Sequence, residues 1–163
     1  TLYVVERSGG RVFYAGPVKP QTMDAQTWDE VKVESLKKFI VEWRTVTTDR
    51  KAQEAYWDAA YEHIGQGSPA KKVLDEWYAG NNPVKRSSAE IANVEYRSYG
   101  KLGESTYNIW WTETTRGLNG EMKSEKTWQA TLPTIRHLPS SEQARDENPL
   151  GVLITELSFH EVL

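Results

Sequence analysis

Hydrophobic residues recur in steps of three and four along the first half of the chain. This spacing places them on one face of a helix predicted over residues 27–46, and Thr27 and Glu30 have the spacing of a capping box at its start. Two more helices are predicted, over residues 49–64 and 68–80, because alanine and aromatic residues repeat at helical spacing in these segments. Asp49 and Ser68-Pro69 are the expected start signals of the two helices. The expected buried face of the first helix comprises Val33, Leu36, Ile40 and Trp43.

From about residue 86 the hydrophobic period changes to two, which is typical of strands with one buried face. Residues 86–136 predict a three-stranded meander, with a hairpin signal at Leu118-Asn119-Gly120. Residues 137–149 are polar and predict a loop that allows one helical turn after Ser140-Ser141. A last strand is predicted over residues 150–159.

The N-terminal residues 1–20 predict a β-hairpin around Ser8-Gly9-Gly10, followed by a linker. The order is then hairpin, three helices and four strands, and the whole of residues 1–163 fits a single domain. Helices that are segregated from an antiparallel sheet predict an α+β fold, in which the helices cover one face of a strongly curved sheet.

Composition and charge exclude several classes of protein. The chain carries 20 basic and 23 acidic residues, a net charge of −3, so it lacks the basic footprint of nucleic-acid binding and direct contact with nucleic acid is not expected. It has no cysteine, which excludes disulfide scaffolds, thiolate metal sites and cysteine nucleophiles. No apolar run approaches the ~20 residues that span a bilayer. Because the chain begins with Thr1, we expect that an upstream segment has been removed.

Candidate chemistry is sparse. The sequence has no nucleophile elbow, no phosphate-binding loop and no histidine pair at metal-ligand spacing, so no catalytic residue, cofactor or metal is predicted. His63, His137 and His160 are interpreted as helix-end or surface residues. The helical carboxylates, including Glu42, are interpreted as solvated surface. Glu113 lies on the apolar face of its strand; we interpret it as a solvated strand end, and the alternative places it inside the cone between sheet and helices.

Trp110 and Trp111 point to opposite faces of one predicted strand. Unless both faces are covered, one of them lies away from the helix-packed core. Trp110 is therefore the candidate for an exposed aromatic residue on a partner surface. Most other tryptophan and tyrosine residues follow helix or strand periodicity and are interpreted as core, the alternative being a platform for a sugar or nucleotide.

A short motif, Asn148-Pro149-Leu150-Gly151, precedes the last predicted strand. Pro149 fixes its own φ and biases Asn148 toward an extended conformation, and the Asn148 side chain can bond nearby backbone. Gly151 permits a close approach or an unusual dihedral angle. The motif predicts a shaped turn that sets the register of the last strand.

The motif and several other segments, in this order, resemble the periplasmic domain of TrbF-type conjugal transfer proteins. These proteins belong with the VirB-type bitopic inner-membrane component of type IV secretion systems. The matching segments are residues 2–6, Gly16-Pro17, residues 39–49, Asn81-Asn82-Pro83, residues 110–113, residues 126–130 and residues 147–152.

The resemblance implies a nuclear-transport-factor-two-like fold, a curved antiparallel sheet of about four strands packed on three helices, here with an N-terminal β-hairpin. It also implies the periplasmic domain of a bacterial inner-membrane single-pass protein, which meets the membrane only through an N-terminal helix absent from this chain. The family has no known catalytic role and acts as an assembly or scaffold component of the channel. The implied partners are other channel components and the protein itself, as a weak homodimer or higher oligomer, with residues 148–151 supporting self-association.

Two other functions remain compatible with this sequence. The first is a small-ligand-binding or enzymatic domain on the same cone-shaped fold, with Glu113 and Tyr107 as the first candidates to line a pocket between helices and sheet. The second is a binding module for sugar or peptidoglycan that uses exposed tryptophan residues.

Overall fold

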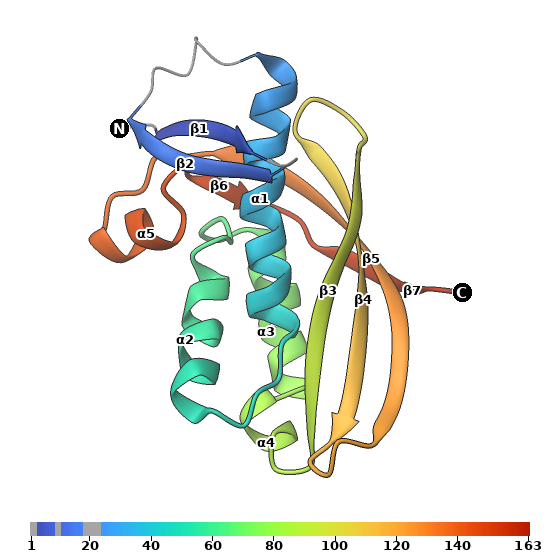
Figure 1. Ribbon diagram of the computed structural model, residues 1–163. Coiled ribbons are helices and arrows are strands. Elements are labelled where there is room, and N and C mark those ends of the chain that lie inside the picture. Colours follow the sequence, from blue (N-terminus) through green and yellow to red (C-terminus); the bar gives the residue numbers. More distant parts are fainter. Residues whose placement is uncertain (1–2, 9–10, 18–23) are drawn as a thin grey trace.

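The computed structural model describes residues 3–8, 11–17 and 24–163, arranged as an antiparallel sheet against a group of helices (Figure 1). Residues 1–2, the predicted hairpin turn at residues 9–10 and residues 18–23 of the predicted linker lie outside the described residues. The predicted α+β fold is confirmed. The elements are β1 (Tyr3–Ser8), β2 (Arg11–Pro17), α1 (Ala25–Arg44), α2 (Arg50–Tyr61), α3 (Pro69–Gly80), α4 (Pro83–Arg86), β3 (Glu90–Lys101), β4 (Thr106–Gly117), β5 (Met122–Arg136), α5 (Glu142–Glu147), β6 (Val152–Ile154) and β7 (Ser158–Val162).

The main sheet has the order β3-β4-β5, and both β6 and β7 pair with β5 in antiparallel fashion. The single last strand predicted over residues 150–159 is therefore wrong. β6 pairs with residues 134–136 of β5, whereas β7 pairs with residues 127–131. Pro133 lies between these two stretches of β5 and has no N–H to donate to a neighbouring strand. The segment after β6 therefore leaves the edge of β5 at Pro133, and the chain pairs with β5 again as β7.

Polar side chains set where the helices begin. Asp24 accepts a hydrogen bond from the backbone N–H of Thr27 at 2.7 Å, so α1 begins two residues before the predicted position and Asp24, not Thr27, is its N-cap. Asp49 caps α2 as the sequence predicts. Asn82 accepts from two backbone N–H groups and caps the one-turn helix α4, which follows α3 after two residues.

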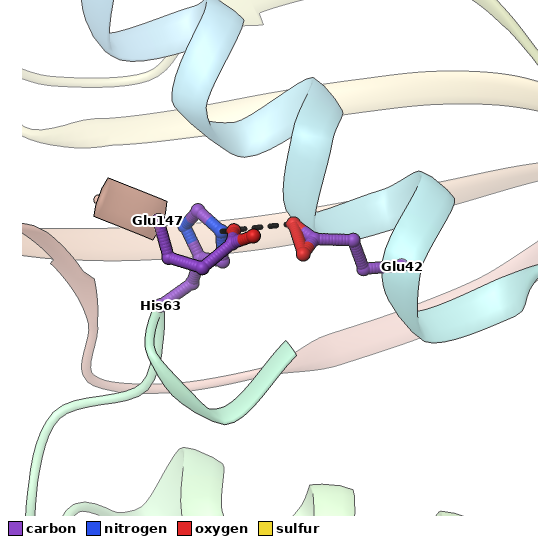
Figure 2. A group of neighbouring side chains, drawn as sticks. All are labelled: Glu42, His63 and Glu147. Atoms are coloured by element: carbon purple, nitrogen blue, oxygen red, sulfur yellow. Dashed lines mark hydrogen bonds and ion pairs between the residues drawn. The ribbon is translucent and has the colours of Figure 1, made fainter. Parts of the chain in front are cut away.

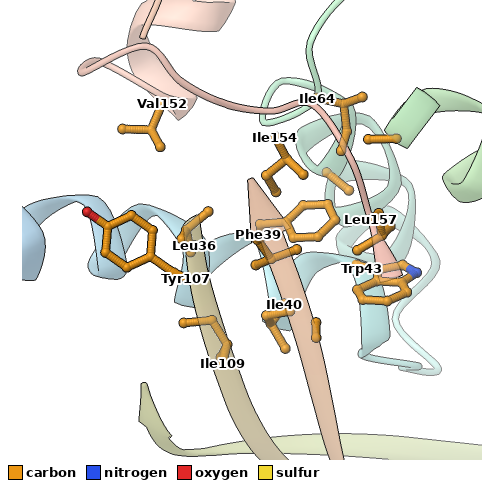
Figure 3. Packing of buried hydrophobic residues seen from close by; sticks show 14 of the residues in the cluster. Leu36, Phe39, Ile40, Trp43, Ile64, Tyr107, Ile109, Val152, Ile154 and Leu157 are labelled. Atoms are coloured by element: carbon orange, nitrogen blue, oxygen red, sulfur yellow. The ribbon is translucent and has the colours of Figure 1, made fainter. Parts of the chain in front are cut away.

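The core lies between α1 and the concave face of the sheet (Figure 3). The predicted face of α1 is confirmed, since all four of its residues are at most 2% exposed. Trp43 stacks on Phe39 and meets Trp111 of β4 and Phe159 of β7 with ring centroids 6.0 and 5.0 Å away. The sheet and β6 contribute the buried residues Tyr107, Ile109, Trp111, Ala130, Leu132, Val152 and Ile154.

A helix that spans a membrane must be both long and apolar. Within the described residues, no helix meets both requirements.

Candidate functional site

The motif at residues 148–151 forms a tight turn between α5 and β6. The backbone N–H of Gly151 donates to the carbonyl oxygen of Asn148 at 3.0 Å, which closes the turn. Leu150 is fully buried in the core, and Pro149 is half-buried. The motif therefore anchors the chain immediately before it enters the sheet, as its proline and glycine predict.

The Asn148 side chain is 2% exposed and holds three segments together. Its Nδ2 donates to the carbonyl oxygens of Glu62 at 3.1 Å and Val152 at 2.8 Å, and its Oδ1 accepts from the backbone N–H of Val152 at 3.2 Å. Ser35 Oγ donates to the same Oδ1 at 3.3 Å. A single amide thus joins α1, the end of α2 and the start of β6.

Gly151 has a φ of +63°, in the left-handed region that favours glycine. It also lies against the chain at His137: a Cβ atom at this position would be 2.6 Å from the His137 carbonyl carbon and still closer to its oxygen. The amide of His137 donates to the Gly151 carbonyl oxygen at 2.8 Å. Both requirements that the sequence attributes to this glycine, an unusual dihedral angle and a close approach, therefore occur together.

A cluster of titratable side chains comprises Glu42, His63 and Glu147, and Glu147 directly precedes the turn (Figure 2). His63 Nε2 is 3.0 Å from Glu42 Oε1 and 3.7 Å from Glu147 Oε2. His63 is fully buried and Glu42 is 4% exposed, whereas the side chain of Glu147 is 27% exposed. Lys38 forms an ion pair with Glu147 Oε2 at 2.8 Å. The cluster joins α1, the residue two positions after α2, and the last residue of α5.

The two carboxylates of this cluster favour the protonated form of His63, whereas its burial favours the neutral form. Burial lowers the pKa of His63, but its bonds with Glu147 and Glu42 outweigh that effect and the net direction is upward. Burial raises the pKa of Glu42 despite its bond with His63. The interactions of Glu147 with His63 and then Lys38 lower the pKa of that carboxyl to about 2. Glu147 is therefore the carboxylate that stays ionised.

Two sequence-based interpretations are corrected by this cluster. Glu42 is not part of a solvated helix face, and His63, although it follows a helix end, is completely buried. His137 and His160 are exposed, as the sequence predicts. The three partners are far apart in the chain, so spacing does not reveal them. The available signal is that Glu42 lies three residues after Phe39 and next to Trp43, at the edge of the buried helix face.

A second buried pair joins the end of α1 to β4. Arg44 Nε donates to Glu113 Oε2 at 2.9 Å, and the two side chains are 1% and 8% exposed. The interpretation of Glu113 as a solvated strand end is therefore wrong, and the alternative inside the cone is right. Burial lowers the pKa of Arg44, and Glu113 opposes that shift. Trp77 and Trp128 hold the guanidinium by cation–π contacts, with its Cζ 3.9 and 4.5 Å from their ring centroids.

A cavity of about 400 Å³ borders this pair. Trp77 and Trp128 form part of its wall, and its charged lining comprises Arg44, Arg86, Glu90, Glu113, Lys123 and Lys126. Arg44 Nη1 is buried and has no hydrogen-bond partner among the described residues. Tyr107, the other residue expected to line a pocket with Glu113, does not line this cavity. It is buried near the start of β4, and its hydroxyl donates to Asp29 at 2.6 Å.

Trp110 and Trp111 separate as the strand period predicts. Trp111 is fully buried under the helices, and Trp110 is half-buried on the other face of the sheet. Trp110 pairs across the sheet with Ser98 and Gln129. Its ring lies over Gly100, where an added Cβ atom would be 3.4 Å from Trp110 Cζ3. Its role as a partner surface stays a prediction.

Comparison with solved structures places this fold among known proteins. VirB8 of Agrobacterium tumefaciens superposes with a TM-score of 0.71 at 18% identity, over 91% of this chain and 98% of that one. The TrwG component of a type IV secretion system from Bartonella birtlesii superposes with a TM-score of 0.68 at 17% identity, over 82% and 92% of the two chains. The predicted nuclear-transport-factor-two-like fold is confirmed by these similarities.

Sequence comparison points in the same direction. The conjugal transfer protein TrbF of Rhizobium radiobacter is 22% identical over 125 residues, which are 77% of this chain and 57% of that protein. The chain thus spans little more than half of that relative. The model of the family described as VirB8 protein matches residues 1–162. The chain therefore belongs to the VirB8 family, in agreement with the TrbF-type resemblance of its motifs.

Proposed function

We propose that the chain is a non-enzymatic scaffold component of a type IV secretion channel for conjugative DNA transfer. It acts in the periplasm through contacts with other channel components and through self-association. The observation that carries this proposal is the family match over residues 1–162. Two relatives add support, since TrbF of Rhizobium radiobacter is a conjugal transfer protein and TrwG of Bartonella birtlesii is a component of a type IV secretion system.

Two sets of buried polar residues fit a scaffold because they bond to other parts of the chain. Arg44 and Glu113 pair with each other, and Asn148 bonds the backbone of two other segments. We place the chain as the periplasmic domain of an inner-membrane single-pass protein, with the membrane helix N-terminal to it. The greater length of the TrbF relative leaves room for such a segment.

The function is tested by a transfer assay in donor cells. Deleting the complete gene is expected to abolish acquisition of the element by recipients, and the full-length protein supplied in trans is expected to restore it. Residues 1–163 alone are expected to fail, because a scaffold without its anchor does not assemble at the membrane. Transfer that continues at the same frequency after deletion would contradict the proposal.

The outer face of the sheet around Trp110 is proposed as a contact surface for another channel component. Trp110→Ser is expected to reduce transfer by at least about tenfold, since aromatic residues at interface centres commonly carry more than about 1.4 kcal/mol of binding energy. Leu118→Ser is the matched control, because Leu118 is 57% exposed in the β4–β5 turn. Equal transfer by both variants, with wild-type melting temperatures, would remove Trp110 from the interface.

For the turn at residues 148–151 we propose a supporting role in self-association. Asn148 and Gly151 hold α5 and the start of β6 in fixed positions, and this arrangement presents a defined surface beside the turn. The turn thereby acts through the surface that it shapes, since Asn148, Leu150 and Gly151 are themselves buried.

One observation favours a second function, the binding of a small anionic ligand. The cavity beside Arg44 has four basic and two acidic residues in its lining, although the whole chain is acidic, and Arg44 Nη1 lacks a hydrogen-bond partner among the described residues. A carboxylate could accept from that nitrogen between the two tryptophan rings. Transfer that is independent of the gene would favour this second function.

A further inference from the structure

We propose that Glu42, His63 and Glu147 bind a single divalent transition-metal ion, with Zn²⁺ as the ion whose ligand preferences fit best. One imidazole nitrogen and two carboxylate oxygens converge here from three separate segments of the chain (Figure 2). The three ligand atoms all lie within 4.8 Å of one another. Zinc is commonly held by this combination of nitrogen and oxygen ligands, with water in the remaining position.

The distances suit an ion of this size. Zinc bonds of about 2.0–2.2 Å at tetrahedral angles separate neighbouring ligand atoms by roughly 3.3–3.6 Å. The distances from His63 Nε2 to the two carboxylates, 3.0 and 3.7 Å, lie on either side of that range. Small side-chain rotations would place all three atoms in the coordination sphere.

The hydrogen bonds around His63 orient it as a ligand. Asn148 Oδ1 has no proton, so the Ser35 hydroxyl donates its only hydrogen to that atom. The contact of 3.5 Å between Ser35 Oγ and His63 Nδ1 then requires the hydrogen on Nδ1. Nε2 is left facing the carboxylates, where it carries either a second proton or a metal ion. A metal-bound histidine typically donates its other N–H to such an outer partner.

A surface depression borders the site on the side of Glu147. It has a volume of about 520 Å³ and is lined by Glu147 together with Asp58, Glu142 and Asp146. The last three are exposed, and their charge raises the local concentration of cations in the depression. Glu147 therefore connects an acidic surface depression to the buried histidine.

Lys38 is the natural competitor of the ion. Its Nζ lies 2.8 Å from Glu147 Oε2, the same oxygen that faces His63, and it also donates to the Glu147 carbonyl oxygen at 3.0 Å. An arriving ion has to share or displace this ion pair. Removing the ammonium should thus strengthen metal binding, which a purely structural cluster would not show.

Metal binding would be linked to the neighbouring turn. Glu147 ends α5 and is followed directly by Asn148, so an ion on Glu147 would tie α5 to α1 and to the end of α2. Loading is therefore expected to raise the melting temperature in proportion to the logarithm of the free ion concentration.

The test is calorimetric titration of the metal-stripped 163-residue chain with Zn²⁺, repeated with Co²⁺ and its visible absorption spectrum. One ion per chain is expected, with a micromolar or lower dissociation constant and a cobalt spectrum of low coordination number. His63→Gln and Glu147→Gln are each expected to weaken binding by at least about a hundredfold, because loss of a ligand costs more than loss of an outer partner, which costs about 10–100-fold. The double variant His137→Gln/His160→Gln, which removes both exposed histidines, is expected to bind as the wild type does.

Lys38→Met supplies an independent measurement on a 46%-exposed side chain that is not a ligand. It is expected to tighten zinc binding by about tenfold, since it removes a competing cation from Glu147. Circular dichroism establishes that each variant is folded before titration. Absence of saturable binding to the wild type, binding lost only in the exposed-histidine variant, or unchanged affinity in Lys38→Met would each overturn the proposal.

Discussion

Replacement of Gly151 by alanine is expected to lower the free energy of unfolding by about 3–5 kcal/mol, a large fraction of the stability of one domain. The new Cβ would collide with the backbone carbonyl of His137, and backbone cannot rotate away as a side chain can. The left-handed φ of +63° adds its own strain. Chemical denaturation followed by tryptophan fluorescence measures the change.

Gly67→Ala separates these two contributions. Gly67 has nearly the same dihedral angle, with a φ of +67°, but a Cβ there would meet no atom within 4 Å. Its expected cost is therefore the conformational strain alone, about 1 kcal/mol. If the two variants were equally destabilised, the collision with His137 would not be the reason for the glycine in the motif.

The Gly151→Ala variant also tests the proposed role of the turn in self-association. Where conditions keep it folded, analytical ultracentrifugation is expected to show weaker association than in the wild type. A folded variant with unchanged association would restrict the turn to stabilising β6.

Local patterns predict most of the fold. The face of α1 follows from steps of three and four, and the separation of Trp110 from Trp111 follows from the strand period. Asp49 marks the start of α2 because its side chain caps the helix, and Ser68-Pro69 marks the start of α3 because proline is favoured at the first helical position. The division of the last strand does not follow from local pattern, because it depends on Pro133, which lies in the partner strand.

The buried charges cannot be predicted from the same patterns. Arg44 and Glu113 are 69 residues apart, and His63 meets Glu42 across 21 residues. A charged residue next to a buried helix face is usually solvated, and only tertiary structure reveals the partner that allows it to be buried. The motif at residues 148–151 can be recognised because its proline and glycine restrict the backbone locally.

The Arg44–Glu113 pair is expected to have the second large effect. Glu113→Leu leaves the guanidinium of Arg44 buried without its carboxylate, which should cost about 3–5 kcal/mol of stability. Trp111 Nε1 loses an acceptor as well, because it donates to Glu113 Oε2 at 3.3 Å. Denaturant titration of the single variant measures the loss.

The double variant Arg44→Met/Glu113→Leu shows whether the loss comes from the unpaired charge. It fills similar volume without any buried ion, so it is expected to recover at least about 2 kcal/mol relative to Glu113→Leu. The cation–π contacts with Trp77 and Trp128 disappear in the double variant, which keeps the recovery incomplete. Strictly additive losses in Arg44→Met, Glu113→Leu and the double variant would mean that the two side chains are not coupled. Recovery would instead show that Glu113 offsets the cost of burying the Arg44 charge. Glu113 would thereby allow the end of α1 to pack against β4.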